Sequence, residues 1–197
     1  MILCGEGVKR QKNFELTTKE YQFEVLFGLQ TDTYDILGLT AISTIPSLPN
    51  DLLQQIKESI PKYMGKFQQS YPPFSSARVN GKPLFQWVKE GKLSEVVIPT
   101  VEVEISKLNF LKSYELEVRE LRQILMERIS KVTSGDFRQK EIIEKWKIVL
   151  DSEENKDKKI LIVQMVATVS PGTYIRSLAH RLGQDLGTGA LAFDIFR

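Results

Sequence analysis

Tyr174 and Arg176 are the residues whose types and placement best suit chemistry in this chain. They lie within residues 170–183, where an apolar, strand-like run meets a helix-like pattern through a Pro-Gly turn. The first turn of a helix has unpaired backbone amides, and arginine adds a planar fork of donors that fits a carboxylate or phosphate. This corner is therefore a candidate anion-binding or active site. The alternative is that Thr173 caps the helix while Tyr174 and Arg176 are surface residues.

Motifs of several common enzyme classes are missing from the sequence. It contains no GxxxxGK[ST], GxGxxG, HExxH or GxSxG pattern, which argues against nucleotide hydrolysis, dinucleotide binding and zinc-dependent hydrolysis. The single cysteine, Cys4, cannot form a disulfide within the chain, and together with the single histidine, His180, it cannot build a Cys/His zinc site. We expect neither a metal nor a cofactor.

Composition favours one globular domain of ordinary core size. The 197 residues are 42% hydrophobic and 26% charged, which falls within the single-domain range. The 27 Lys and Arg against 25 Asp and Glu leave a net charge of +2, so nucleic-acid binding would have to come from local patches. No run approaches the roughly 20 apolar residues of a membrane span, and the N-terminal apolar run is too short for a signal peptide. We expect a cytoplasmic protein.

The elements that must position this corner begin with a strand and a helix. Phe23, Val25 and Phe27 alternate with other residues as in a half-buried strand, and apolar residues recur at helical spacing between Pro49 and Gly65. Asn-Gly is the strongest short signal for a hairpin turn, and proline is favoured where a helix begins. We therefore predict a strand over 21–29, a helix over 49–65, a tight turn at Asn80-Gly81 and a short helix over 83–91.

The second half combines two more strands with a pair of helices. Apolar and polar residues alternate over 97–110, whereas two amphipathic runs, 114–130 and 136–150, have helical spacing and are joined through Ser134-Gly135. The charged run 151–159 reads as a solvated linker, and 160–169 as a buried strand. Because strands and helices mix without a βαβ rhythm, we predict an α+β fold with a mixed, mostly antiparallel sheet flanked by helices.

Three motifs, in one order along the chain, carry a resemblance to a known family. Residues 170–178 read SPGTYIRSL and are followed by DLGTGA, residues 19–35 read KEYQFEVLFGLQTDTYD, and residues 72–91 read PPFSSARVNGKPLFQWVKEG. These segments resemble the [ST]xGTYIRxL, KxYxxxxxxGxxTDTxD and PPxYSAxKVNG motifs of TruB-type pseudouridine synthases. The resemblance implies the pseudouridine synthase fold over 1–197, with 111–159 as an inserted helical hairpin and charged linker.

The resemblance also implies an activity and a set of site residues. The family isomerises uridine to pseudouridine in the TΨC loop of tRNA, on a flipped nucleotide and without a cofactor. By motif position, Tyr21 and Arg176 match catalytic residues: the tyrosine that stacks on the target base and the arginine that pairs with the nucleophilic aspartate. Tyr174 and Ile195 match residues contacting the target nucleotide, and for Asp35 we prefer a structural role within its turn.

Basic residues that could contact tRNA phosphates, or simply form a solvated face, are Lys9, Lys12, Lys19, Arg78 and Lys82. Of these, we assign Lys19 and Lys82 to substrate binding.

One departure from the family pattern concerns the nucleophile. The family's aspartate belongs to a GGxLDPxAxG motif that precedes the segment matched here by Gly5 to Lys9, and the 197 residues contain no such motif. We therefore expect an inactive fragment that lacks the nucleophilic Asp and any PUA-like domain, and that is monomeric. Two alternatives remain open: a non-catalytic tRNA-binding module or RNA chaperone, and an interaction protein whose functional part is the helical hairpin.

Overall fold

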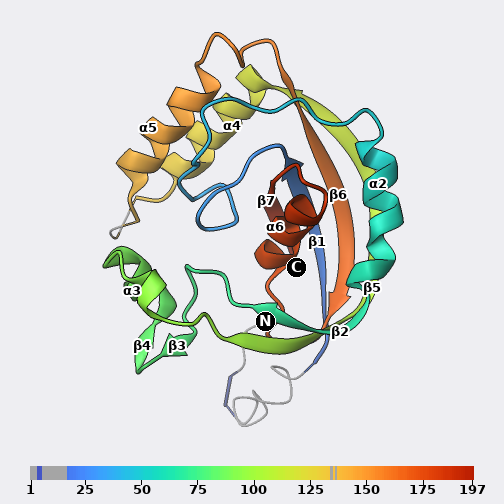
Figure 1. Ribbon diagram of the computed structural model, residues 1–197, viewed down its shortest axis with the longest axis vertical. Helices are drawn as coiled ribbons and strands as arrows, with labels where there is room; N and C mark the ends of the chain where they lie inside the picture. The colour runs from blue at the N-terminus through green and yellow to red at the C-terminus, as the bar shows by residue number, and fades with distance from the viewer. Residues whose placement is uncertain (1–3, 6–16, 134, 136) are drawn as a thin grey trace.

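The computed structural model describes residues 4–5, 17–133, 135 and 137–197. Its elements follow one another in a mixed order of strands and helices (Figure 1). They are β1 (Lys19–Phe27), α2 (Leu52–Ser59), the 3-10 helix η2 (Ile60–Tyr63), β2 (Gly65–Ser70), β3 (Arg78–Val79), β4 (Lys82–Pro83), α3 (Leu84–Lys89), η3 (Leu93–Glu95), β5 (Thr100–Glu117), α4 (Val118–Ser130), α5 (Gln139–Leu150), β6 (Lys159–Val169), α6 (Ile175–Asp185) and β7 (Ala190–Phe196).

A five-stranded sheet in the order β2-β5-β6-β1-β7 forms the centre of the fold. All of its neighbouring strands pair antiparallel, and β6 runs between β5 and β1 over most of its length. The run Ile160–Val169 predicted as a buried strand is therefore a central strand, with neighbours on both sides. The α+β prediction, with a mostly antiparallel sheet, is confirmed.

Two hydrophobic clusters form the core. In β1, Phe23, Val25 and Phe27 join one cluster, which also takes side chains from α2 and α6, while Leu26 joins the other. Successive side chains of a strand point to opposite faces, so the predicted apolar face of β1 is confirmed. The second cluster is built largely by the α4–α5 hairpin, whose Leu121, Leu125 and Trp146 are fully buried.

The helical hairpin is present, but its start and its linker differ from prediction. Residues 114–117 belong to β5, and α4 begins at Val118 behind a reciprocal capping box of Glu117 and Glu120. The alternation of β5 continues into this stretch, so Tyr114 was wrongly placed in the helix. The charged run 151–159 is not a simple solvated linker, because Asn155 within it is fully buried. Its side chain accepts from the Ile45 amide at 3.0 Å and donates to two carbonyls, Ser43 O and Val149 O.

A small unit made of β3, β4 and α3 projects from the main sheet and faces the loop end of the α4–α5 hairpin (Figure 1). Its turn is the predicted one: Asn80 and Gly81 both have positive φ angles, 52° and 78°, as the two-residue hairpin turn requires. The short helix predicted over 83–91 is confirmed as α3, which begins directly after Pro83. Among the described residues, no helix is long and apolar enough to cross a membrane.

Candidate active site

The corner between β6 and α6 holds Arg176 in a fixed place. After β6, the chain turns at Gly172, which has a φ of +85°, and the Thr173 hydroxyl donates to the Ser170 carbonyl at 2.8 Å. Helix α6 then begins at Ile175, with Tyr174 at its N-cap position and no capping side chain. Thr173 therefore closes the turn and does not cap the helix, which puts Arg176 in the first turn of α6.

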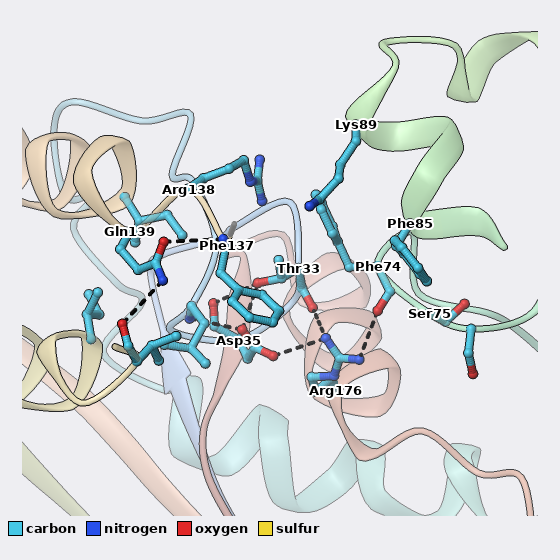
Figure 2. A pocket seen from close by; sticks show the side chains of 15 residues that line it. Thr33, Asp35, Phe74, Ser75, Phe85, Lys89, Phe137, Arg138, Gln139 and Arg176 are labelled. Carbon is cyan, nitrogen blue, oxygen red and sulfur yellow. Dashed lines mark hydrogen bonds and ion pairs between the residues drawn. The ribbon is translucent and has the colours of Figure 1, made fainter. Parts of the chain in front are cut away.

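The guanidinium of Arg176 points toward two loops (Figure 2). Its Nη1 donates to the Thr33 carbonyl at 2.9 Å and lies 3.0 Å from Asp35 Oδ2, and its Nη2 donates to the Phe74 carbonyl at 3.3 Å. Only 22% of the Arg176 side chain and 21% of the Asp35 side chain are exposed. The alternative in which Arg176 is an ordinary surface residue is therefore wrong.

Asp35 holds both its own turn and Arg176. One carboxylate oxygen, Oδ1, accepts from the Thr33 hydroxyl at 2.7 Å and from the Leu37 amide at 2.9 Å. The other, Oδ2, faces Arg176. The structural role predicted for Asp35 is therefore confirmed, and an ion pair with Arg176 is added to it. Hydrogen bonds to a charged group are stronger than neutral ones, so this carboxylate fixes the direction in which the guanidinium points.

A cavity of about 680 Å³ opens beside this ion pair. A volume of this order is typical of sites that hold a small molecule or a nucleotide. Its walls come from four separate parts of the chain, namely the TDTYD turn after β1, the Phe74 loop with α3, the loop end of the α4–α5 hairpin and the first turn of α6 (Figure 2). The lining residues are Thr33, Asp35, Leu37, Phe74, Ser75, Ser76, Phe85, Lys89, Ile129, Val132, Phe137, Arg138, Gln139, Ile142 and Arg176.

Arg138 ties the hairpin to the same turn that holds Arg176. Its Nη1 lies 2.7 Å from Asp32 Oδ2 and its Nη2 donates to Asp32 Oδ1 at 3.3 Å. Its guanidinium also lies 4.3 Å from the centre of the Phe74 ring. The sequence contained no local signal for this contact, because Asp32 and Arg138 are far apart in the chain and Arg138 stands in a loop. That the Phe74 loop belongs to the site could have been predicted from the sequence, because Phe74 lies within the PPFSS motif.

The predicted residues Tyr21 and Tyr174 are not part of the cavity lining. The backbone of Tyr174 is bound by Gln69, whose Oε1 accepts from its amide at 2.8 Å and whose Nε2 donates to its carbonyl at 3.2 Å. The Tyr174 ring stands edge-on to Tyr71 at 5.6 Å. Tyr21 is partly buried against the first hydrophobic cluster, and the Arg197 guanidinium lies 6.0 Å from its ring centre. The roles predicted for both tyrosines stay predictions.

The remaining predicted residues are spread over the fold. Ile195 lines a second, smaller cavity of about 260 Å³, which Asp35 also borders. Lys82 lies 2.5 Å from Glu90 and sits over the Trp87 ring at 3.8 Å. Lys19 opens β1, opposite Val169 of β6. Lys9 and Lys12 lie outside the described residues.

Tyr34 of the TDTYD turn stacks on His180 of α6. The two rings are 3.8 Å apart and nearly parallel, and Tyr34 has a positive φ of 66°. Burial lowers the pKa of His180 below its ordinary value, so the imidazole favours its neutral form. Within the described part of the chain, no group of three or more His, Cys, Asp or Glu is placed to hold a metal ion.

Sequence comparison identifies the class of protein to which this fold and site belong. Residues 1–127 match the TruB family pseudouridylate synthase (N terminal domain). That match covers more than half of the chain, and the chain therefore belongs to the TruB family of pseudouridylate synthases.

Several curated proteins named tRNA pseudouridine synthase B are similar to the chain. Those of Treponema denticola and Aquifex aeolicus are 29% identical over 185 residues and 25% identical over 197 residues, which is 93% and 100% of this chain but 43% and 52% of theirs. The protein of Protochlamydia amoebophila is 30% identical over 200 residues, 100% of this chain and 56% of its own. The chain thus spans about half the length of the curated relatives it matches. A solved Cbf5-Nop10-Gar1 complex aligns over 91% of this chain and 29% of its own, with 16% identity and a TM-score of 0.41.

Proposed function

We propose that this chain contributes the Arg176 side of the active site of a tRNA pseudouridine synthase, which isomerises uridine in the TΨC loop. The observation that carries the proposal is the placement of Arg176 at the wall of a nucleotide-sized cavity, held by Asp35 and two backbone carbonyls. Membership of the TruB family supplies the reaction class.

The reaction needs an acid that Arg176 can orient. The C1′–N1 bond of uridine breaks and a C1′–C5 bond forms, the C5 hydrogen leaves as a proton, and N1 gains a proton, so no oxidant or reductant is required. In the proposal, the nucleophile is the aspartate of the family's GGxLDPxAxG motif, which these 197 residues do not contain. Arg176 donates three hydrogen bonds within the described residues, and a guanidinium has further N–H groups for a second carboxylate. It would orient that aspartate and stabilise its charge.

The other site residues have proposed roles that follow from their motif positions. Tyr21 would stack on the flipped base, Tyr174 would contact the target nucleotide and Ile195 would pack against it. Lys19 and Lys82 would bind tRNA phosphates. The Lys82 ammonium, which pairs with Glu90 in this structure, would then contact both the Glu90 carboxylate and a phosphate. The chain would act as a monomer in the cytoplasm, on tRNA.

Tritium release from tRNA transcribed with [5-³H]uridine tests the proposal, because the isomerisation frees the hydrogen at C5. The protein is made both as the 197-residue chain and as a chain preceded by the family's GGxLDPxAxG segment. We expect tritium release from the longer protein. In that protein Arg176→Lys should lower the rate by about 100-fold or more, as loss of a preorganised charge-stabilising group does.

Arg181→Lys is the matched control, because Arg181 lies on the same helix but is exposed and outside the cavity. Its activity should stay close to that of the parent. Release from neither protein, with tRNA still bound, would reject the enzyme and favour the non-catalytic tRNA-binding module. Equal rates for Arg176→Lys and the parent would reject the role given to Arg176.

A further inference from the structure

Phe137 is a large apolar side chain that the fold leaves exposed at the cavity beside Arg176. It is 60% exposed, although it lines the cavity and its side chain points toward the Asp35–Arg176 pair (Figure 2). Phe137 is not a member of either core cluster. None of the three family motifs includes it. Its ring packs against Gly135 of its own loop, where an added Cβ would lie 2.5 Å from the ring, but it takes no part in the packing of the two core clusters.

The loop that carries Phe137 is held on both sides. The Phe137 amide donates to Gln139 Oε1 at 3.2 Å, and Gln139 Nε2 donates to the Val132 and Gly135 carbonyls, each at 3.2 Å. The next residue, Arg138, has a φ of +59° and is anchored by Asp32. A left-handed conformation is unfavourable for arginine, and such strain persists where the surrounding structure enforces it, often at ligand-binding sites. Hydrogen bonds and an ion pair therefore hold the loop that carries the Phe137 ring.

The same cavity contains a buried polar atom without a partner. Ser75 is only 5% exposed, and its hydroxyl has no hydrogen-bond partner among the described residues. Buried hydroxyls are normally paired, and because this oxygen is shielded from solvent, a ligand in the cavity would reach it only after rotation of the Ser75 side chain. Ser75 lines the cavity together with Phe74 and Phe85. The occupant should thus offer a flat face to aromatic rings and a hydrogen-bonding edge to a hydroxyl.

The charges around the cavity narrow the chemistry of the occupant. Lys89, Arg138 and Arg176 line it against one carboxylate, Asp35. Arg138 is paired with Asp32, and Arg176 is paired with Asp35. Unpaired nucleotides combine a flat base, polar base edges and a negatively charged phosphate, and single-stranded nucleic acids are bound by aromatic stacking together with positive charge. An RNA base fits all three features of the cavity.

We propose that Phe137 of the α4–α5 hairpin stacks on an unpaired RNA base that enters this cavity, with the Ser75 hydroxyl bound to the edge of the same base. The inference rests on the proposed function for the identity of the RNA, a tRNA TΨC stem–loop. It makes the inserted hairpin part of the RNA-binding site, in addition to the tyrosine that the family motif supplies.

Binding of a fluorescently labelled TΨC stem–loop RNA to the 197-residue chain measures the contribution of Phe137. Phe137→Ala should weaken binding by about 5- to 150-fold, which is the range for loss of one base–aromatic stack. Phe137→Tyr should bind like the parent, because it keeps the aromatic face. Ile148→Ala is the matched control, since Ile148 is also 60% exposed on the same hairpin but does not line the cavity.

A probe on the base separates stacking from general binding. The stem–loop is made with 2-aminopurine at each loop position in turn, and stacking on an aromatic ring quenches its fluorescence. We expect quenching at one position with the parent and with Phe137→Tyr, and none there with Phe137→Leu. Equal affinity and quenching for Phe137→Leu, Phe137→Ala and the parent would overturn the inference while leaving the proposed function intact. A parent chain that does not bind the RNA would also overturn it, whereas the proposed function is judged separately by tritium release.

Discussion

Replacing Trp146 tests whether the α4–α5 hairpin is a structural half of this domain. Trp146 is fully buried in the second hydrophobic cluster, and its Nε1 donates to the Ile36 carbonyl at 3.2 Å. Truncating a buried tryptophan to alanine costs about 3–5 kcal/mol. The Ile36 carbonyl would lose its partner as well, at about 1 kcal/mol. We therefore expect Trp146→Ala to lower the free energy of unfolding by about 4–6 kcal/mol, a large share of the roughly 5–15 kcal/mol of a typical domain.

Urea unfolding followed by far-ultraviolet circular dichroism measures this loss without depending on tryptophan fluorescence. Ile148→Ala is the control on the same helix, because Ile148 is 60% exposed, and it should change the free energy of unfolding by no more than about 0.5 kcal/mol. Trp146→Phe keeps an aromatic ring but loses the hydrogen bond, so its effect should be intermediate. A loss below about 1 kcal/mol for Trp146→Ala, with an unchanged denaturant slope, would refute the packing of the hairpin on the sheet.

Two further predictions concern α6. A Cβ at Gly183 would lie 2.0 Å from the Ala190 amide nitrogen and 2.3 Å from the Gly189 carbonyl carbon, so Gly183→Ala should destabilise the domain by about 1–3 kcal/mol in the same urea assay despite the better helix propensity of alanine. His180 has a lowered pKa because it is buried, so the unfolded chain binds a proton more readily than the folded one. Its contribution to stability should be complete above the unfolded pKa of about 6.5 and should be lost as the pH falls below that value and through the lowered pKa of the folded state. His180→Gln should flatten that part of the stability profile, and because His180 is the single histidine, an NMR titration of its ring measures the pKa directly.

Local sequence patterns predicted the elements whose signals are local. The alternation of Phe23, Val25 and Phe27 identified the buried face of β1, and Asn80-Gly81 identified the tight turn through its two positive φ angles. The Pro-Gly corner placed Arg176 at the start of a helix. In each case, the physical preference that forms the structure is confined to a few neighbouring residues, so it can be recognised without knowledge of the fold.

The features that the sequence did not reveal depend on partners far along the chain. Tyr114 and Val118 are spaced four apart, which suits a helix, but alternation with Leu116 suits a strand equally, and pairing with β6 selects the strand. Asn155 lies in a charged run, and its burial follows from contacts with the 43–45 segment. The cavity wall formed by Phe137 and Arg138 likewise exists only because the hairpin loop folds back against the TDTYD turn and the Phe74 loop.

The α4–α5 hairpin and the Arg176 site share one short turn, and this coupling decides how the hairpin can be studied. Asp32 holds Arg138 of the hairpin, and Asp35, three residues later, holds Arg176. Gly38 packs under the same turn so closely that a Cβ there would lie 2.3 Å from the Thr33 hydroxyl. A displacement of the hairpin would therefore move the turn that orients Arg176. Deleting the hairpin would also remove half of the second core cluster, so loss of RNA binding after such a deletion would report unfolding. Single substitutions at exposed positions such as Phe137 are the changes that separate a binding role of the hairpin from its structural one.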